Sequence, residues 1–257
     1  MNNPYRRSYT LLPNKNINFK EKRNKVGVLP DYSTFYEDLN ALDHLRYFSK
    51  ILGLKSSKEN LIKILKRVEL EDAIYLKTKK FSFGMKKKLG IAQALINNPD
   101  ILFLDEPTSG VDANAVLNIH KIINDIAKHG TTIFLTSHNL DEVEKICDEI
   151  AIMDKGVIRA QGTMEQLKSN YDKNITVNIK HSILPPDILK ILKKELHAID
   201  SNVQWNGNTT SIVVPNENTI ARINRLFLEM NIDVFRIEVD EPTLEEIFLN
   251  TGGNKHN

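Results

Sequence analysis

Apolar residues along this chain change between short continuous runs and helical spacing. A run over 26–29 stops at a proline and predicts a strand that ends in a loop. Apolar residues then recur every three or four positions over 45–52, and a capping box formed by Ser56 and Glu59 predicts the start of a second helix. We therefore expect a helical region without strands over about 40–98.

Strands and helices alternate over the next part of the chain. The pattern predicts, in order, a helix that ends before Pro99, a strand at 101–104, a helix at 113–128, a strand at 131–135 and a helix at 139–147. The run at 101–104 is apolar at every position, which suits a strand buried on both faces of a sheet. Strand, helix and strand in this order predict a parallel sheet with crossover helices, and two later runs at 149–153 and 157–160 predict a hairpin.

A domain boundary is expected at about 170–174, after a helix that opens at Thr163. Beyond it the predicted order is βαββαβ, which matches the ferredoxin-like split motif, and a short helix follows at 243–249. The predicted division is an irregular segment at 1–24, an α/β domain at 25–170 with its helical part at about 40–98, and a small α+β domain at 171–257.

The composition is that of an ordinary globular protein. Of the 257 residues 41% are hydrophobic and 26% charged, and the net charge of +2 is too nearly balanced for a chain whose main task is to wrap nucleic acid. A single cysteine, Cys147, indicates a reducing compartment. No apolar run is long enough for a membrane helix, so we expect a soluble protein whose membrane role comes through a partner. A lysine run at 86–88 is interpreted as a solvated helix face.

Two adjacent carboxylates, Asp105 and Glu106, follow the buried strand at 101–104. Ligands bind at the carboxyl ends of strands in α/β sheets, so Asp105 could hold Mg²⁺ through water while Glu106 polarises the water that attacks a γ-phosphate. The competing interpretation is an acidic corner between strand and turn, for which Asp-Glu-Pro is suitable chemistry.

Two other segments change the balance between these interpretations. Ser82 and Gly84 open a helix about twenty residues earlier, where a hydroxyl and free N–H groups form an anion site, although a serine there can also be a simple N-cap. His138 follows the strand at 131–135 and is expected at the same sheet edge as the acids, although a histidine there is commonly a structural hydrogen bonder.

Together these segments resemble the ATP-binding subunits of ABC transporters, from about residue 26 to 162 and on to the C-terminus. Ser82-Phe83-Gly84-Met85 resembles the ABC signature, and the stretch from Ile101 to Asp105 resembles Walker B. By the same resemblance Glu106 falls at the catalytic glutamate and His138 at the switch histidine.

Two more loops belong to the resemblance. The segment 109–112, which includes Asp112, resembles the D-loop, and Asp31 occupies the position where the family usually carries the Q-loop glutamine. Phe83 and Met85 also depart from the usual glycine and glutamine of the signature. The ending at 241–248 resembles the tail of an exporter-like subgroup that handles drugs, bacteriocins or sodium.

The resemblance implies a P-loop NTPase-like α/β core with a helical subdomain, and ATP and Mg²⁺ as cofactors. It also implies a second ATP-binding subunit in a homo- or heterodimer, a separate transmembrane permease and no nucleic acid. Catalysis would fall to Glu106 and His138, nucleotide contacts to Ser82, Gly84, Met85, Asp31 and Asp112, and the metal to Asp105. The expected location is cytoplasmic, at the inner face of the membrane.

One expected motif is missing from the sequence. A phosphate-binding loop needs G-x-x-x-x-G-K-[ST], yet none of the 11 glycines precedes a lysine. We therefore expect a core that is incomplete at the N-terminus, with weak Mg-ATP binding and little ATPase activity. A non-catalytic partner that lends its signature to an intact subunit is the alternative; a soluble ABC protein of translation or DNA repair is less favoured, because neither a repeat nor a heptad run is visible.

Overall fold

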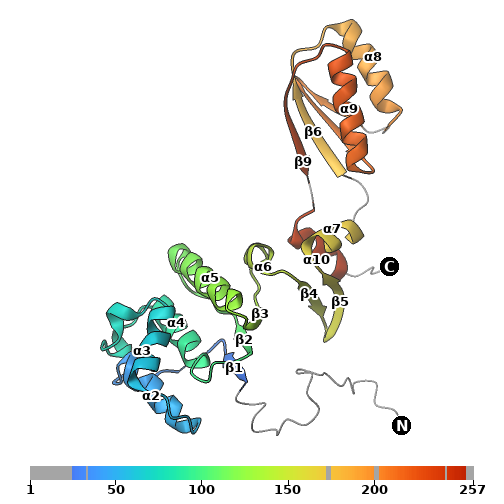
Figure 1. The fold of residues 1–257 in the computed structure, drawn as a ribbon. Helices are drawn as coiled ribbons and strands as arrows, with labels where there is room; N and C mark the ends of the chain where they lie inside the picture. Colours follow the sequence, from blue (N-terminus) through green and yellow to red (C-terminus); the bar gives the residue numbers. More distant parts are fainter. Residues whose placement is uncertain (1–24, 33, 172–174, 200–202, 241, 253–257) are drawn as a thin grey trace, which may run out of the picture. The chain divides into compact units, whose positions relative to one another are not determined.

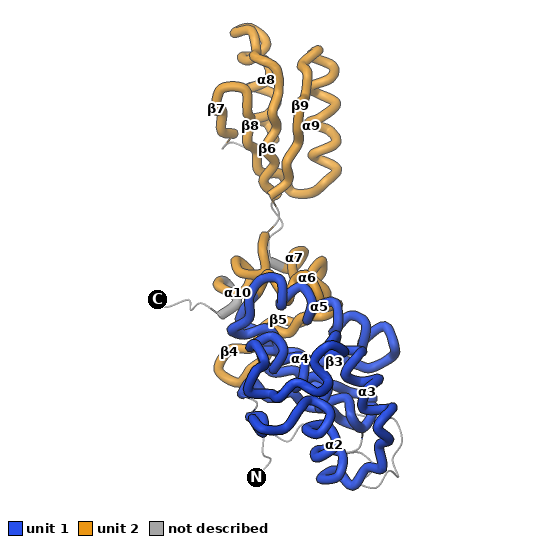
Figure 2. Tube along the Cα trace, turned by 90° about the vertical axis from the view of Figure 1, so that its left-hand side faces the viewer, with its two compact units in different colours: residues 1–139 blue, residues 140–257 orange. Residues whose placement is uncertain are grey.

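The computed structural model describes most of the chain, namely residues 25–32, 34–171, 175–199, 203–240 and 242–252 (Figure 1). The segment 1–24, predicted as irregular, lies outside the described residues. Two compact units make up the chain, residues 1–139 and residues 140–257, as Figure 2 shows in two colours.

A parallel sheet of three strands forms the centre of the first unit. Its strands are β1 (Val26–Leu29), β2 (Ile101–Asp105) and β3 (Thr132–Thr136), in the order β1-β2-β3. The continuous apolar runs therefore form strands where the pattern predicts them, and β2 is the central strand. Because the strands are parallel, the loops that follow β1, β2 and β3 leave the sheet at the same edge.

The helices described in this unit are α2 (Ala41–Ile51), α3 (Lys58–Arg67), α4 (Phe83–Ala94) and α5 (Ala113–Lys128), with short 3-10 turns at Glu71–Ala73 and Thr78–Lys80. Of these, α4 and α5 pack on the sheet. Helices α2, α3 and α4 pack on one another, α4 contacts β1 and α5 contacts β3 (Figure 1). The described part of 40–98 holds helices and no strand, as expected.

One predicted helix start is wrong by a residue. The N-cap of α3 is Ser57, whose Oγ accepts the N–H of Asn60 at 3.2 Å, and not Ser56. Both serines can accept a hydrogen bond from three residues on, so the local spacing alone does not separate them.

The two faces of the sheet differ in how well they are covered. Leu102 and Leu104 face the helices and are buried, whereas Val28 and Phe134 on the other face remain 54% and 53% exposed. Phe103 stacks on Phe134 in that second face, with ring centroids 5.3 Å apart. The described residues thus cover one face of the sheet and leave an apolar row on the other.

The second unit holds two separate hydrophobic clusters. The smaller one joins an antiparallel hairpin of β4 (Ile150–Asp154) and β5 (Val157–Gly162) to helices α7 (Met164–Tyr171) and α10 (Leu244–Gly252). Its buried residues are Ile150, Ile152, Leu167, Leu244 and Ile247. Helix α6 (Leu140–Ile146) also contacts α10. The last helix therefore packs with residues before 170, and not with the sheet that precedes it in the sequence.

The larger cluster lies in a four-stranded antiparallel sheet with two helices. The elements follow as β6 (Ile175–His181), α8 (Pro186–His197), β7 (Gln204–Asn206), β8 (Thr209–Val214), α9 (Glu217–Glu229) and β9 (Val234–Asp240). The strand order β7-β8-β6-β9 is that of the ferredoxin-like split motif, so the βαββαβ expectation is confirmed. The boundary near residue 170 falls between the two clusters in sequence and stays a prediction.

Candidate functional site

The candidate site is built on the loops that follow β2 and β3. Asp105, the last residue of β2, pairs in register with Thr136, the last residue of β3. The N–H of Glu106 then donates to the carbonyl oxygen of Thr136 at 3.1 Å, which extends the ladder by one bond beyond the strands. This register places the two acids and the His138 loop at the same sheet edge, as the sequence predicts.

Glu106 and His138 are in direct contact. Nδ1 of His138 lies 2.8 Å from Oε2 of Glu106, with the carboxylate side chain 22% exposed and the imidazole 78% exposed. Glu106 has a φ of +48°, a left-handed conformation that costs free energy in a residue with a Cβ. A partly sheltered carboxylate can accept a proton from water, and the open imidazole beside it can interact with a neighbouring anion.

Asp105 is an exposed carboxylate at the end of the strand, and Oγ1 of Thr136 donates a hydrogen bond to its Oδ1. A carboxylate beside a hydroxyl is an oxygen donor set that suits Mg²⁺, which keeps most of its waters. Among the residues that the structure describes, no cluster of three or more histidine, cysteine or acidic side chains could hold a metal. The oxygen donors of Asp105 and Thr136 thus suit a Mg²⁺ ion held largely through water.

The start of α4 carries the second predicted segment. Oγ of Ser82 accepts the N–H of Met85 at 3.2 Å, so this serine acts as the N-cap. Gly84 is buried, and a Cβ added to it would lie 3.0 Å from the Cβ of Ala115 on α5. The glycine thus allows α4 and α5 to approach closely, and the side chain of Phe83 remains 56% exposed beside this helix start.

The loop between β2 and α5 meets the start of α4. Gly110 has a φ of +74°, and a Cβ there would lie 3.0 Å from the ring of Phe83. Asp112 is the N-cap of α5 and accepts the N–H of Ala115 at 3.0 Å. The structure therefore links two groups of predicted residues, the helix start at 82–85 and the loop that includes Asp112.

Asp31, expected to contact the nucleotide, lies beside this loop and contacts two side chains of the protein. Its Oδ1 accepts a hydrogen bond from Oγ of Ser109 at 3.1 Å and faces Nζ of Lys87 at 3.4 Å. Lys87 is 6% exposed, so the prediction that the lysine run is a solvated face is wrong at this position. Gly84 and Ile91, three residues before and four after it, are buried too, and this helical spacing is the signal that identifies Lys87 as inward-facing.

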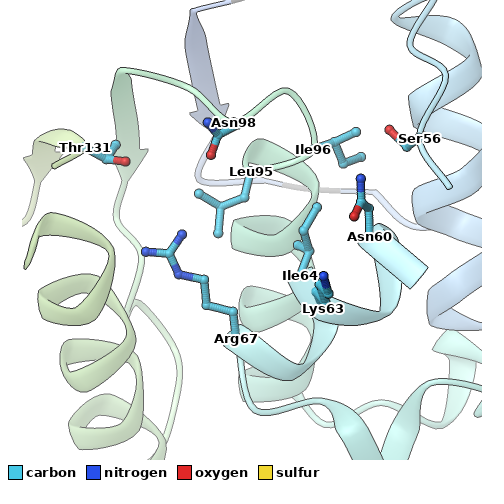
Figure 3. Close-up of a pocket in the computed structure, with 9 residues that line it drawn as sticks. All are labelled: Ser56, Asn60, Lys63, Ile64, Arg67, Leu95, Ile96, Asn98 and Thr131. Atoms are coloured by element: carbon cyan, nitrogen blue, oxygen red, sulfur yellow. The ribbon is translucent and has the colours of Figure 1, made fainter. Parts of the chain in front are cut away.

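A pocket of about 330 Å³ lies elsewhere in the first unit (Figure 3). Its lining includes Lys63 and Arg67 of α3, Asn98 and Thr131. The last two precede β2 and β3, so this pocket lies at the amino ends of the strands and contains none of the predicted site residues.

Comparisons with known proteins agree with this geometry. The family model for the ABC transporter matches residues 6–109, and the model for the C-terminal domain of DrrA1-3-like ATP-binding proteins matches residues 162–251. The bacitracin transport ATP-binding protein BcrA of Bacillus licheniformis is 31% identical over 234 residues, which cover 90% of this chain and 74% of that protein.

Two solved structures share the fold. An ATP-binding subunit of an ABC transporter gives a TM-score of 0.51 at 28% identity, with 59% of this chain and 64% of that chain covered. A dimeric ATP-binding cassette bound to ADP and phosphate gives 0.50 at 22% identity, with 56% and 65% covered. This chain thus spans a little under two thirds of each solved chain.

Proposed function

This chain belongs to the ATP-binding proteins of ABC transporters, and we propose that it acts as the ATP-binding subunit that couples ATP hydrolysis to transport by a separate membrane subunit. The observation that carries the proposal is the contact between Glu106 and His138 at the end of β2, beside Asp105. The likeness to a bacitracin transport ATP-binding protein supports a role in transport. None of the described helices has the length and apolar character needed to cross a membrane.

In the proposed reaction, Glu106 orients the attacking water and accepts its proton. His138, held by Glu106 through Nδ1, presents its imidazole to the γ-phosphate. Asp105 would hold Mg²⁺ through water, with Thr136 orienting the carboxylate, and the ion would neutralise charge on the phosphate oxygens. The three residues can act together because they lie at the same edge of the sheet.

The start of α4 would serve a nucleotide held by a second ATP-binding subunit. Ser82 is exposed at the positive end of a twelve-residue helix, and the dimeric ATP-binding cassette among the similar structures supports a pairing of two such subunits. Ser82, Gly84 and Met85 would then contact that nucleotide. Asp31 and Asp112 lie in the loops beside the start of α4 and would complete the nucleotide contacts. We thus propose that the chain pairs with a second ATP-binding subunit, binds a membrane subunit and lies at the inner face of the membrane.

A second candidate role is that of a non-catalytic partner. The sequence has no glycine followed by lysine, whereas Ser82 and Gly84 are present at the start of α4 and Ser82 is exposed. A polypeptide of this sequence would then bind Mg-ATP weakly by itself and lend Ser82 and Gly84 to the site of an intact subunit. Tight Mg-ATP binding by this polypeptide alone would refute the weak-binding expectation.

Two substitutions separate these roles when the chain is mixed with an intact family subunit and its membrane partner. Glu106→Gln should lower ATP hydrolysis by about 100-fold or more at the site where this residue is the base. Ser82→Ala should lower hydrolysis at the partner's nucleotide. If only Ser82→Ala has an effect, the non-catalytic role holds; if neither has one, both proposals fail.

Matched controls exist for both variants. Ser57→Ala removes an N-cap contact of the same 3.2 Å length from α3, away from the site, and so reports the effect of a lost cap alone. Glu165→Gln neutralises an exposed acid on α7. Both controls should leave hydrolysis unchanged.

A further inference from the structure

A buried lysine lies beneath the candidate site and has no role in the proposed chemistry. Lys87 projects from the second turn of α4 and is 6% exposed. Its Nζ donates to the carbonyl oxygen of Glu106 at 2.7 Å, to Oγ of Ser109 at 3.0 Å and to the carbonyl oxygen of Asp31 at 3.2 Å. A lysine ammonium has three donors, and these three acceptors are the nearest of its four; the fourth is Oδ1 of Asp31 at 3.4 Å.

The cluster also balances the charge of the lysine. The carboxylate of Asp31 lies 3.4 Å from Nζ and is the counter-ion of Lys87. Ser109 joins the two loops, because its Oγ lies 3.1 Å from Oδ1 of Asp31 and 3.1 Å from the carbonyl oxygen of Glu106. A buried charge needs such a partner and such hydrogen bonds, so Lys87 fixes the loop after β1 to the loop after β2.

The shortest contact of Lys87 is with a strained residue. Glu106 has a φ of +48° and precedes a proline, and a residue before proline is also restricted in its backbone. Its N–H is bonded to Thr136, and its carbonyl oxygen accepts from Lys87. Both peptide groups of Glu106 are therefore held, and the direction of its Cα–Cβ bond follows from them.

We propose that Lys87 is a positioning residue of the candidate site: by binding the carbonyl oxygen of Glu106 it holds the left-handed turn that brings the Glu106 carboxylate to His138. The proposal rests on the proposed function for its biological meaning. The same ammonium ties Asp31 to this turn, so a movement of the loop after β1 is transmitted to Glu106. Asp31 thereby acts on the base through Lys87, and its negative charge is compensated within the protein.

Amide hydrogen exchange of the chain without nucleotide tests this role, so the result is independent of whether the chain hydrolyses ATP. Lys87→Met keeps an unbranched side chain of similar length and removes the ammonium. We expect the amide of Glu106 to exchange about 10-fold faster in this variant, while the β2 amides of Leu102 and Leu104 keep their rates. Lys86→Met, one residue earlier and half-buried, is the matched control and should change none of them.

Two results would overturn the proposal. In one, the Glu106 amide of folded Lys87→Met exchanges at the original rate. In the other, the β2 amides accelerate by the same factor as Glu106, which shows that Lys87 stabilises the unit as a whole and does not position the turn. The His138 imidazole ¹⁵N spectrum at fixed pH gives a second readout, since Nδ1 should lose the signal of a hydrogen-bonded nitrogen only if the carboxylate moves.

Ser109→Ala keeps the proposal testable if Lys87→Met does not fold. It removes the hydroxyl between Asp31 and the Glu106 carbonyl but leaves the ammonium in place. Faster exchange at Glu106 with unchanged β2 amides is expected again. Unchanged exchange at Glu106 in this variant would count against the cluster as the holder of the turn.

Discussion

Replacing Glu106 by glycine and by alanine separates the backbone of this residue from its carboxylate. Both variants lose the contact with His138, so the difference between their free energies of unfolding depends on the backbone alone. At a φ of +48° a Cβ costs about 1–2 kcal/mol. Glycine costs about 0.4–1 kcal/mol relative to alanine through the greater freedom of the unfolded chain.

The midpoints of these two ranges make Glu106→Gly more stable than Glu106→Ala by about 0.8 kcal/mol. Asn118, exposed in the middle of α5, is the matched control, because at a helical φ the order reverses and Asn118→Ala is more stable than Asn118→Gly by about 1 kcal/mol. The reversal of sign between the two positions is the diagnostic result.

Urea unfolding followed by circular dichroism measures both pairs of variants. The single tryptophan, Trp205, lies in β7 of the second unit, so its fluorescence reports that unit separately and shows whether a shift belongs to the first. An alanine variant at 106 that equals or exceeds the glycine variant would refute the left-handed conformation of this turn, and with it the strain argument.

Two further predictions concern stability. Burial lowers the pKa of His44 from 6.5, and the hydrogen bond with Gln93 opposes this shift only in part, so the stability present above pH 6.5 is lost as pH falls through the folded pKa. In urea unfolding between pH 7.5 and 5, His44→Gln should therefore lose less stability than the parent chain. An equal loss in the two proteins would contradict this. Gly27→Ala places a Cβ 2.2 Å from the carbonyl oxygen of Ala94 and should destabilise the chain by about 3 kcal/mol. Gly84→Ala should cost only about 1 kcal/mol, because its Cβ meets a side chain at 3.0 Å and no backbone atom. Equal losses of stability in urea unfolding would contradict the close approach of β1 to α4.

The elements of the fold were largely predictable because their signals are local. The helix α5 (Ala113–Lys128) begins at an N-cap aspartate and ends before a glycine with a φ of +94°, and both ends agree with the predicted range. The packing of α10 with β4 and α7 was not predictable from the same signals. The residues concerned, Leu244 and Ile247, are about 95 positions from Ile150 and Ile152, and apolar spacing does not say which cluster a helix joins.

The candidate site divides in the same way. Asp105, Glu106 and His138 follow strands that the pattern identifies, and parallel pairing then brings them to one edge. Lys87 was misjudged because lysine side chains are usually exposed, and its partner Asp31 is 56 residues away in the sequence. Helical spacing marks Lys87 as inward-facing, but only the placement of the loops after β1 and β2 shows which oxygens its ammonium contacts.

The uncovered face of the first sheet affects how rigidly the strands hold the loops of this site. Val28 and Phe134 are about half exposed, so complete burial of these two side chains would add roughly 1 kcal/mol each to the stability of the unit. They lie on β1 and β3, and the loops after those strands carry Asp31 and His138. A layer that covers this face would hold the strands more rigidly. The hydrogen bonds of the Lys87 ammonium hold the loops after β1 and β2 from the side of α4, so a second support on the open face should make the geometry of the site more precise.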